Sequence, residues 1–183
     1  MDLTGGQPYV AGAGAFLVIC GDTRRHRLVA RRRGEPYDAR LEAFLLAVVD
    51  ATLFAQNLVL AMESMGYGAC YIGGLRNNPA EVARLLDIPA GVYPLYGLCL
   101  GRPAQDPLPR PRLDPRAVLF DDRYPDDDTM LAFIDEYDAR YERYLERRGA
   151  EPRPWSAIMA EKFREPRRPD LARFYSAQGA DLT

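Results

Sequence analysis

The order of hydrophobic and polar residues along the chain predicts strands mixed with helices. Short apolar runs bounded by glycine, typical of buried strands, occupy residues 14–22, 69–74 and 93–101. Between the first two runs, residues 38–65 carry apolar side chains at helical spacing on nearly every side, so this long helix belongs at the centre of the fold. Gly66 follows it and is a suitable terminator.

The remaining helices are predicted from caps and periodicity. Asn78 is followed by Pro79 at the first position and Glu81 at the third, a strong start signal for a helix through Ile88. Residues 103–116 are rich in proline, which excludes a helix there. Further helices are predicted at 126–148 (ended by Gly149), 155–163 and 170–178. This order of elements favours α/β or α+β.

The twenty-residue apolar stretch at 43–62 is nearly long enough to span a bilayer. It carries Asp50, Gln56 and Asn57 near its middle, and such groups are costly in hydrocarbon. A buried core helix or a dimer-interface helix is therefore the better interpretation, with a membrane span as the alternative.

Composition narrows the class of protein. With 183 residues, of which 48% are hydrophobic and 27% charged, the chain predicts a single globular domain. A net charge of −2 argues against a nucleic-acid binder, and the basic runs at 23–27 and 30–34 are predicted to be solvated turns flanking a strand. No signal peptide is expected, because the first eight residues carry neither a basic run nor an apolar run. Each cysteine lies in an apolar run, which indicates reduced, buried thiols in a cytoplasmic protein: Cys20, Cys70 and Cys99.

Several patterns favour structure over chemistry. The aspartates at 121–128 lack calcium-loop spacing and suit a helix N-terminus. Tyr137, Tyr141 and Tyr144 lie near helical spacing and predict a packing stripe. His26 is the only histidine and has no evident nucleophile partner, so no catalytic triad is expected.

Two segments carry candidate binding chemistry. In the sequence RPR at 110–112, extended backbone places Arg110 and Arg112 on one side as a phosphate clamp, with a surface polyproline linker as the alternative. The glycines of GYGACYIGGLRNN, residues 66–78, let backbone approach a flat polar ligand edge, with a plain tight turn as the alternative. The spacing is neither G-x-G-x-x-G nor a Walker loop.

Both segments belong to a longer pattern. LTGGQPYV, AQNLVLAMESMGYGACYIGGLRNN, YPLYGLCLGRPA, PRPRL and YLERRG occur in this order. Together they resemble the FMN-dependent nitroreductase superfamily, specifically its oxygen-insensitive NADPH nitroreductase and flavin reductase branch, over essentially the whole chain. The resemblance implies an α+β nitroreductase-like fold over residues 1–183, with a mostly antiparallel central sheet flanked by helices and a long central helix. It also implies an intimate homodimer with FMN at the interface.

The resemblance also assigns site residues. The family positions that contact the flavin correspond here to Gln7 and Tyr9. The loop whose backbone faces the isoalloxazine edge corresponds to Tyr71, Ile72, Gly73 and Gly74. The pair that binds the FMN phosphate corresponds to Arg110 and Arg112. The NADPH positions are Arg76 and Arg148. No side chain is expected to act as a general acid or base.

The expected activity is ping-pong transfer of two electrons from NADPH through FMN to nitroaromatics, quinones or flavins. Members of the family carry a segment before LTGGQ that includes a second phosphate-binding motif, and this chain starts at Met1 without it. Either the true start lies upstream of Met1, or the protein has lost part of its flavin site. In the second case, the alternative hypothesis is a truncated, non-catalytic homologue that keeps the dimer scaffold and binds flavin weakly or not at all.

Overall fold

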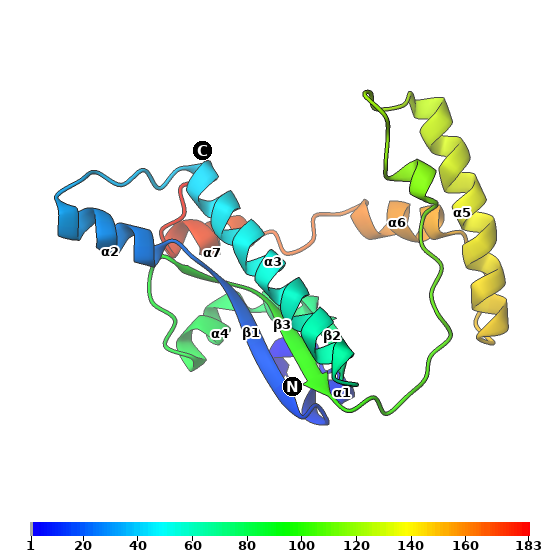
Figure 1. Cartoon of the computed structure of the whole chain (residues 1–183), viewed down its shortest axis with the longest axis horizontal. Helices are drawn as coiled ribbons and strands as arrows, with labels where there is room; N and C mark the ends of the chain where they lie inside the picture. Colours follow the sequence, from blue (N-terminus) through cyan, green and yellow to red (C-terminus); the bar gives the residue numbers. More distant parts are fainter. Residues whose placement is uncertain (1) are drawn as a thin grey trace. The chain divides into compact units, whose positions relative to one another are not determined.

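The computed structural model describes residues 2–183. The chain forms two compact units. The first unit contains the chain up to Ala104 together with Arg168–Thr183, and the second contains Gln105–Arg167. Figure 1 shows both units, coloured along the sequence.

The first unit is built on a three-stranded antiparallel sheet. Its strands are β1 (Ala15–Asp22), β2 (Gly68–Ile72) and β3 (Val92–Gly101), in the order β1-β3-β2. The three predicted strands and the antiparallel sheet are confirmed. β3 is the central strand and the most deeply buried one, which fits its nearly unbroken apolar sequence.

The long helix α3 (Leu41–Ser64) lies along this sheet, as Figure 1 shows. Ala55 and Val59 pack against Ile19, Leu98 and Leu100 to form the core beneath it. The prediction of a long central helix is confirmed. Gly66 follows the helix with φ +81°, a left-handed conformation that glycine adopts without steric penalty.

The other side of α3 is exposed and apolar. Leu46, Val49, Leu53 and Leu60 recur at helical spacing and are each 50–59% exposed. Within residues 2–183, α3 is the one helix long and apolar enough to cross a membrane by length and composition alone. Helix α3 therefore has two apolar faces. One face covers the sheet, and the other is exposed.

Residues 24–33 form a helix, α2, so the prediction of solvated turns for the basic runs is wrong. Arginine and alanine are good helix formers, and their propensity prevails here over the charge of the segment. Gly34 ends α2 in the left-handed conformation, with its N–H bonded to helix carbonyls.

The glycine-rich segment continues from β2 into a 3-10 turn, η2 (Gly73–Asn77), and then into α4 (Pro79–Leu85). The Asn78 side chain accepts a hydrogen bond from the Glu81 N–H at 3.2 Å, which confirms the predicted cap. Two short N-terminal elements, η1 (Asp2–Thr4) and α1 (Pro8–Ala11), were not predicted.

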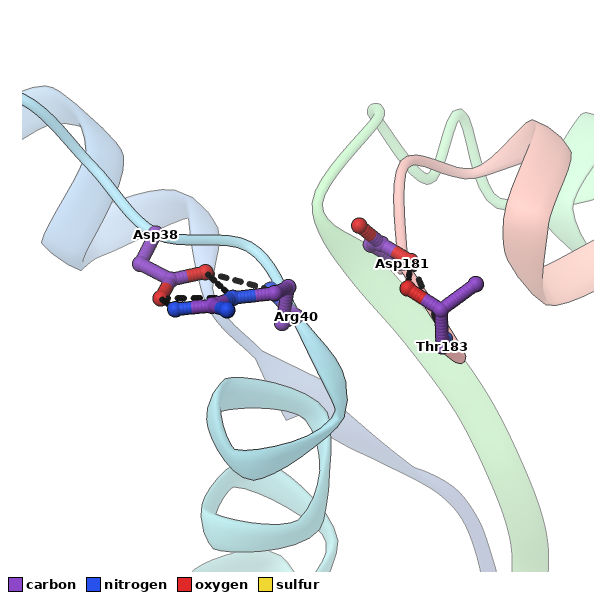
Figure 2. A network of polar contacts seen from close by, with 4 residues as sticks. All are labelled: Asp38, Arg40, Asp181 and Thr183. Carbon is purple, nitrogen blue, oxygen red and sulfur yellow. Dashed lines mark hydrogen bonds and ion pairs between the residues drawn. The ribbon is translucent and has the colours of Figure 1, made fainter.

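The C-terminal segment packs into the core of the first unit. Helix α7 (Leu171–Ala177) brings Tyr175 into a core cluster with Tyr93, and the Tyr175 hydroxyl donates to the Pro94 carbonyl at 2.9 Å. Figure 2 shows the tail beyond it beside the start of α3. There the Arg40 guanidinium, by hydrogen bonding, lowers the pKa of Asp38 to about 2.

Only part of the prediction for the cysteines holds. Cys99 is buried and Cys20 is half-buried, but Cys70 is exposed. Cys70 and Cys99 are opposite each other on β2 and β3, so they lie on the same face of the sheet. The exposure of Cys70 follows from its place on an edge strand.

The second unit contains η3 (Pro115–Ala117), α5 (Asp127–Arg147) and α6 (Trp155–Phe163). Residues 103–114 contain no helix, as predicted, but the 3-10 helix η3 begins at Pro115, so the prediction for 103–116 is wrong at its end; proline suits the first position of a helix. As predicted, Tyr137, Tyr141 and Tyr144 form a buried cluster. Asp126 caps α5 by accepting from the Thr129 N–H at 2.8 Å, a structural use of that acidic stretch. No cluster of three potential metal ligands occurs in residues 2–183.

Candidate functional site

The Gly73–Gly74 segment packs directly beneath η1. A Cβ atom built on Gly74 would lie 2.8 Å from the carbonyl carbon of Thr4 and still closer to its oxygen, so no side chain fits there. The same atom on Gly73 would meet only an Arg76 nitrogen at 3.4 Å. The close neighbour that demands glycine at position 74 is therefore the chain's own backbone.

Arg168 holds this segment from a distant part of the sequence. Its Nη2 donates to the Gly73 carbonyl at 3.2 Å, and its Nε donates to Asn77 Oδ1 at 3.0 Å. Arg168 has a positive φ of 56°, which is uncommon for a residue other than glycine. Sequence reasoning missed this residue, because neither periodicity nor spacing links positions 73 and 168.

Arg76, predicted as an NADPH contact, lies half-buried in the same turn. Its Nη1 donates to the Leu95 carbonyl of the central strand at 2.7 Å. This bond anchors η2 to β3 and occupies one nitrogen of the guanidinium.

Tyr71 and Ile72 precede the glycines, and both have their side chains engaged by the fold. The Tyr71 hydroxyl donates to Gln56 Oε1 of α3 at 3.3 Å, and its ring packs edge-on against Tyr96. The Ile72 side chain is 1% exposed. Any ligand contact made by these two residues through polar atoms other than the Tyr71 hydroxyl must use their backbone.

Gln7 and Tyr9 lie at α1, ahead of the first strand. Gln7 Oε1 is buried and has no hydrogen-bond partner within residues 2–183. A buried acceptor without a partner costs free energy unless something else supplies the donor. Tyr9 is 51% exposed, and its pKa is raised by partial burial and then by the nearby Cys70 and Cys99 thiols.

The predicted phosphate clamp and the second NADPH arginine lie in the second unit. Arg110 lies over the Tyr141 ring, 4.9 Å from its centre, and donates to its hydroxyl at 3.2 Å. Arg112 is exposed and makes no hydrogen bond or ion pair within the described part of the chain. Arg148 follows α5 and donates to the Tyr144 hydroxyl at 3.2 Å.

Gln7, Tyr9 and the loop from Tyr71 to Arg76 all belong to the first unit, while Arg110, Arg112 and Arg148 belong to the other unit. His26, on α2, has no hydrogen-bonded nucleophile among the described residues. The peptide N–H groups of this loop and the unpartnered amide oxygen of Gln7 are groups that can bind the polar edge of a flat ligand. The first unit is thus an α+β fold with a glycine-rich loop between β2 and α4.

Comparison with known proteins identifies the family. Residues 2–102 match the family described as "Nitroreductase family", and residues 110–183 match its C-terminal domain. The chain belongs to the nitroreductase family.

Three similar proteins illustrate the relationship. The oxygen-insensitive NADPH nitroreductase of Salmonella typhimurium is 42% identical over 183 residues, covering 97% of this chain and 72% of the relative. The FMN reductase (NADPH) of Bacillus subtilis is 39% identical, covering 84% of this chain and 64% of the relative. The structure of Bacillus megaterium NfrA1 superposes with a TM-score of 0.93 at 38% identity, covering 98% of this chain and 75% of that one. The nitroreductase-like fold is confirmed.

Proposed function

We propose that this protein is an FMN-dependent NAD(P)H oxidoreductase that passes two electrons to small acceptors such as nitroaromatics, quinones or flavins. The observation that carries the proposal is the buried, unpartnered Gln7 Oε1 in the same unit as the Gly73–Gly74 backbone. The amide edge of a flavin offers N–H donors and carbonyl acceptors, so it can satisfy both. The names of the Salmonella and Bacillus subtilis relatives point to the same chemistry.

The residues of this chain would bind and orient the cofactor. Gln7 would accept a hydrogen bond from the polar edge of the ring, and Tyr9 would flank it. The Tyr71–Gly74 backbone would line the other polar positions, with the N–H groups of Gly73 and Gly74 stabilising negative charge on the ring. When bound, FMN supplies the redox chemistry, and the protein supplies orientation and electrostatics.

Cationic side chains would hold the phosphates. Arg112 has no partner within residues 2–183 and is available to a phosphate, while Arg110 is already oriented by Tyr141. Arg76 and Arg148 would contact NADPH, each through a nitrogen that the fold does not use. This assignment requires no acid or base from a side chain.

The assembly would be a cytoplasmic homodimer formed through α3. One face of the helix covers the sheet, whereas Leu46, Val49, Leu53 and Leu60 leave an exposed apolar stripe on the other. A second copy of the chain would bury this stripe and remove apolar surface from water.

The test is FMN titration of the purified protein, followed by NADPH oxidation with a quinone acceptor. A charge-assisted hydrogen bond contributes about 1.5–3 kcal/mol, so Arg112→Gln should weaken FMN binding by about ten- to a hundredfold. Arg123→Gln is the matched control, because Arg123 is also exposed in the second unit. A wild-type protein that binds no FMN at saturating concentration would refute the proposal in favour of a non-catalytic homologue. Equal affinities of the two variants would refute the role of Arg112.

A further inference from the structure

The Gly73–Gly74 peptide has two polar ends, and the structure shows what holds one of them. The carbonyl of Gly73 and the N–H of Gly74 belong to one planar trans peptide, so they point in opposite directions. Fixing the direction of the carbonyl therefore fixes the direction of the N–H. Arg168 contacts the carbonyl at 3.2 Å.

We propose that Arg168 is a positioning residue: by donating to the Gly73 carbonyl, it fixes the plane of this peptide and turns the Gly74 N–H toward the flavin. The inference rests on the proposed function for the presence of FMN. It assigns a role to a residue that is not among the FMN and NADPH residues predicted from the family resemblance. Arg168 acts through the peptide and is not required to touch the cofactor.

Three observations support this role. Arg168 uses a second nitrogen on Asn77 Oδ1 at 3.0 Å, so the guanidinium joins both ends of η2 and cannot rotate freely. Thr4 packs against Gly74 and leaves no room for a Cβ atom, which restricts the same peptide at its other residue. The positive φ of Arg168 is an unfavourable backbone conformation that persists only where surrounding contacts require it.

The Arg168 guanidinium also changes the strength of the Gly74 N–H as a hydrogen-bond donor. Hydrogen bonds in a chain polarise one another, so a cation on the carbonyl makes the N–H of the same peptide a stronger donor. A stronger donor favours the reduced flavin more than the oxidised one, because reduction places more negative charge on the ring. Arg168 should therefore raise the reduction potential of bound FMN as well as order the loop.

The first measurement is the reduction potential of FMN bound to the wild type, Arg168→Gln and Arg168→Lys. We expect the Gln variant to lose on the order of tenfold in its preference for reduced over oxidised FMN, a decrease of about 30 mV for a two-electron couple. The Lys variant keeps a cation and should recover part of the loss. Arg173→Gln is the charge-matched control, since Arg173 is 86% exposed on α7, and it should leave the potential unchanged.

The second measurement needs no cofactor. In FMN-free protein, the amides of residues 73–77 should exchange with solvent about tenfold faster in Arg168→Gln than in wild type, and Asn77→Ala should show part of this effect. The double variant should be no worse than Arg168→Gln alone, because both changes break one arrangement.

The outcomes separate this inference from the proposed function. If wild type binds FMN and Arg168→Gln has the wild-type potential, the positioning role is wrong while the oxidoreductase proposal stands. If Lys and Gln variants lose equal amounts of potential, the effect is loss of structure and the polarising role is wrong. If wild type binds no FMN, both proposals fail. Unchanged amide exchange in Arg168→Gln also overturns the inference, even if that variant cannot hold FMN.

Discussion

Replacing Gly74 with alanine tests whether the glycine is needed for packing beneath η1. The new Cβ atom would lie 2.8 Å from the Thr4 carbonyl carbon, and the obstacle is backbone that cannot rotate away as a flexible side chain could. Gly74 has no positive φ, so the cost comes from overlap and not from backbone strain. Gly73→Ala is the matched control, because its Cβ atom would meet only the flexible Arg76 guanidinium at 3.4 Å.

Overpacking of this kind costs about 1–3 kcal/mol, which corresponds to a decrease in Tm of roughly 2–12 °C in a chain of this size. The assay is thermal unfolding followed by circular dichroism, without and with FMN. Gly74→Ala should unfold at lower temperature than wild type and gain less from added FMN, while Gly73→Ala stays within about 2 °C of wild type. Equal melting temperatures for the two variants would show that η1 does not pack on Gly74 as the structure has it.

Three further predictions concern other parts of the first unit. Leu53→Arg should give monomers in light scattering, because Leu53 is 59% exposed on the apolar stripe of α3. The control Leu85→Arg, at a residue 60% exposed on α4, should not change the measured mass, and a Leu53→Arg variant that remains dimeric would contradict the proposed interface. Cys70 should be alkylated first by iodoacetamide, because it is exposed whereas burial raises the pKa of Cys20 to about 11; mass spectrometry that finds Cys20 modified first would contradict this. Burial raises the pKa of Tyr175 from 10.0 to about 12, so its contribution to stability is complete below pH 10 and is lost as the pH rises through 12. Over that range Tm should fall more in wild type than in Tyr175→Phe, and parallel curves of Tm against pH would contradict the raised pKa of Tyr175.

Local sequence was sufficient for most of the elements. The glycine-bounded apolar runs became β1, β2 and β3, because a strand buried in a sheet needs little more than a short apolar segment with defined ends. Asn78 with Pro79 and Glu81 fixed the start of α4, since a cap is a contact between residues three apart in the chain. The prediction for the residues of α2 was wrong. The charge of the segment suggested solvated turns, but helix propensity summed over the segment prevailed.

The candidate site depends on contacts that local sequence does not encode. The sequence marked the glycine-rich loop and the family resemblance proposed its ligand, yet the neighbour that excludes a side chain at Gly74 is the Thr4 backbone. Arg168 reaches Gly73 across ninety-five positions, and Arg76 binds the central strand at Leu95. Periodicity and spacing report only neighbours within a few residues, whereas these contacts form after the sheet has brought distant segments together. The sequence by itself therefore determined most of the elements and, through the family resemblance, the class of protein. Only the tertiary structure showed which groups hold the loop in place.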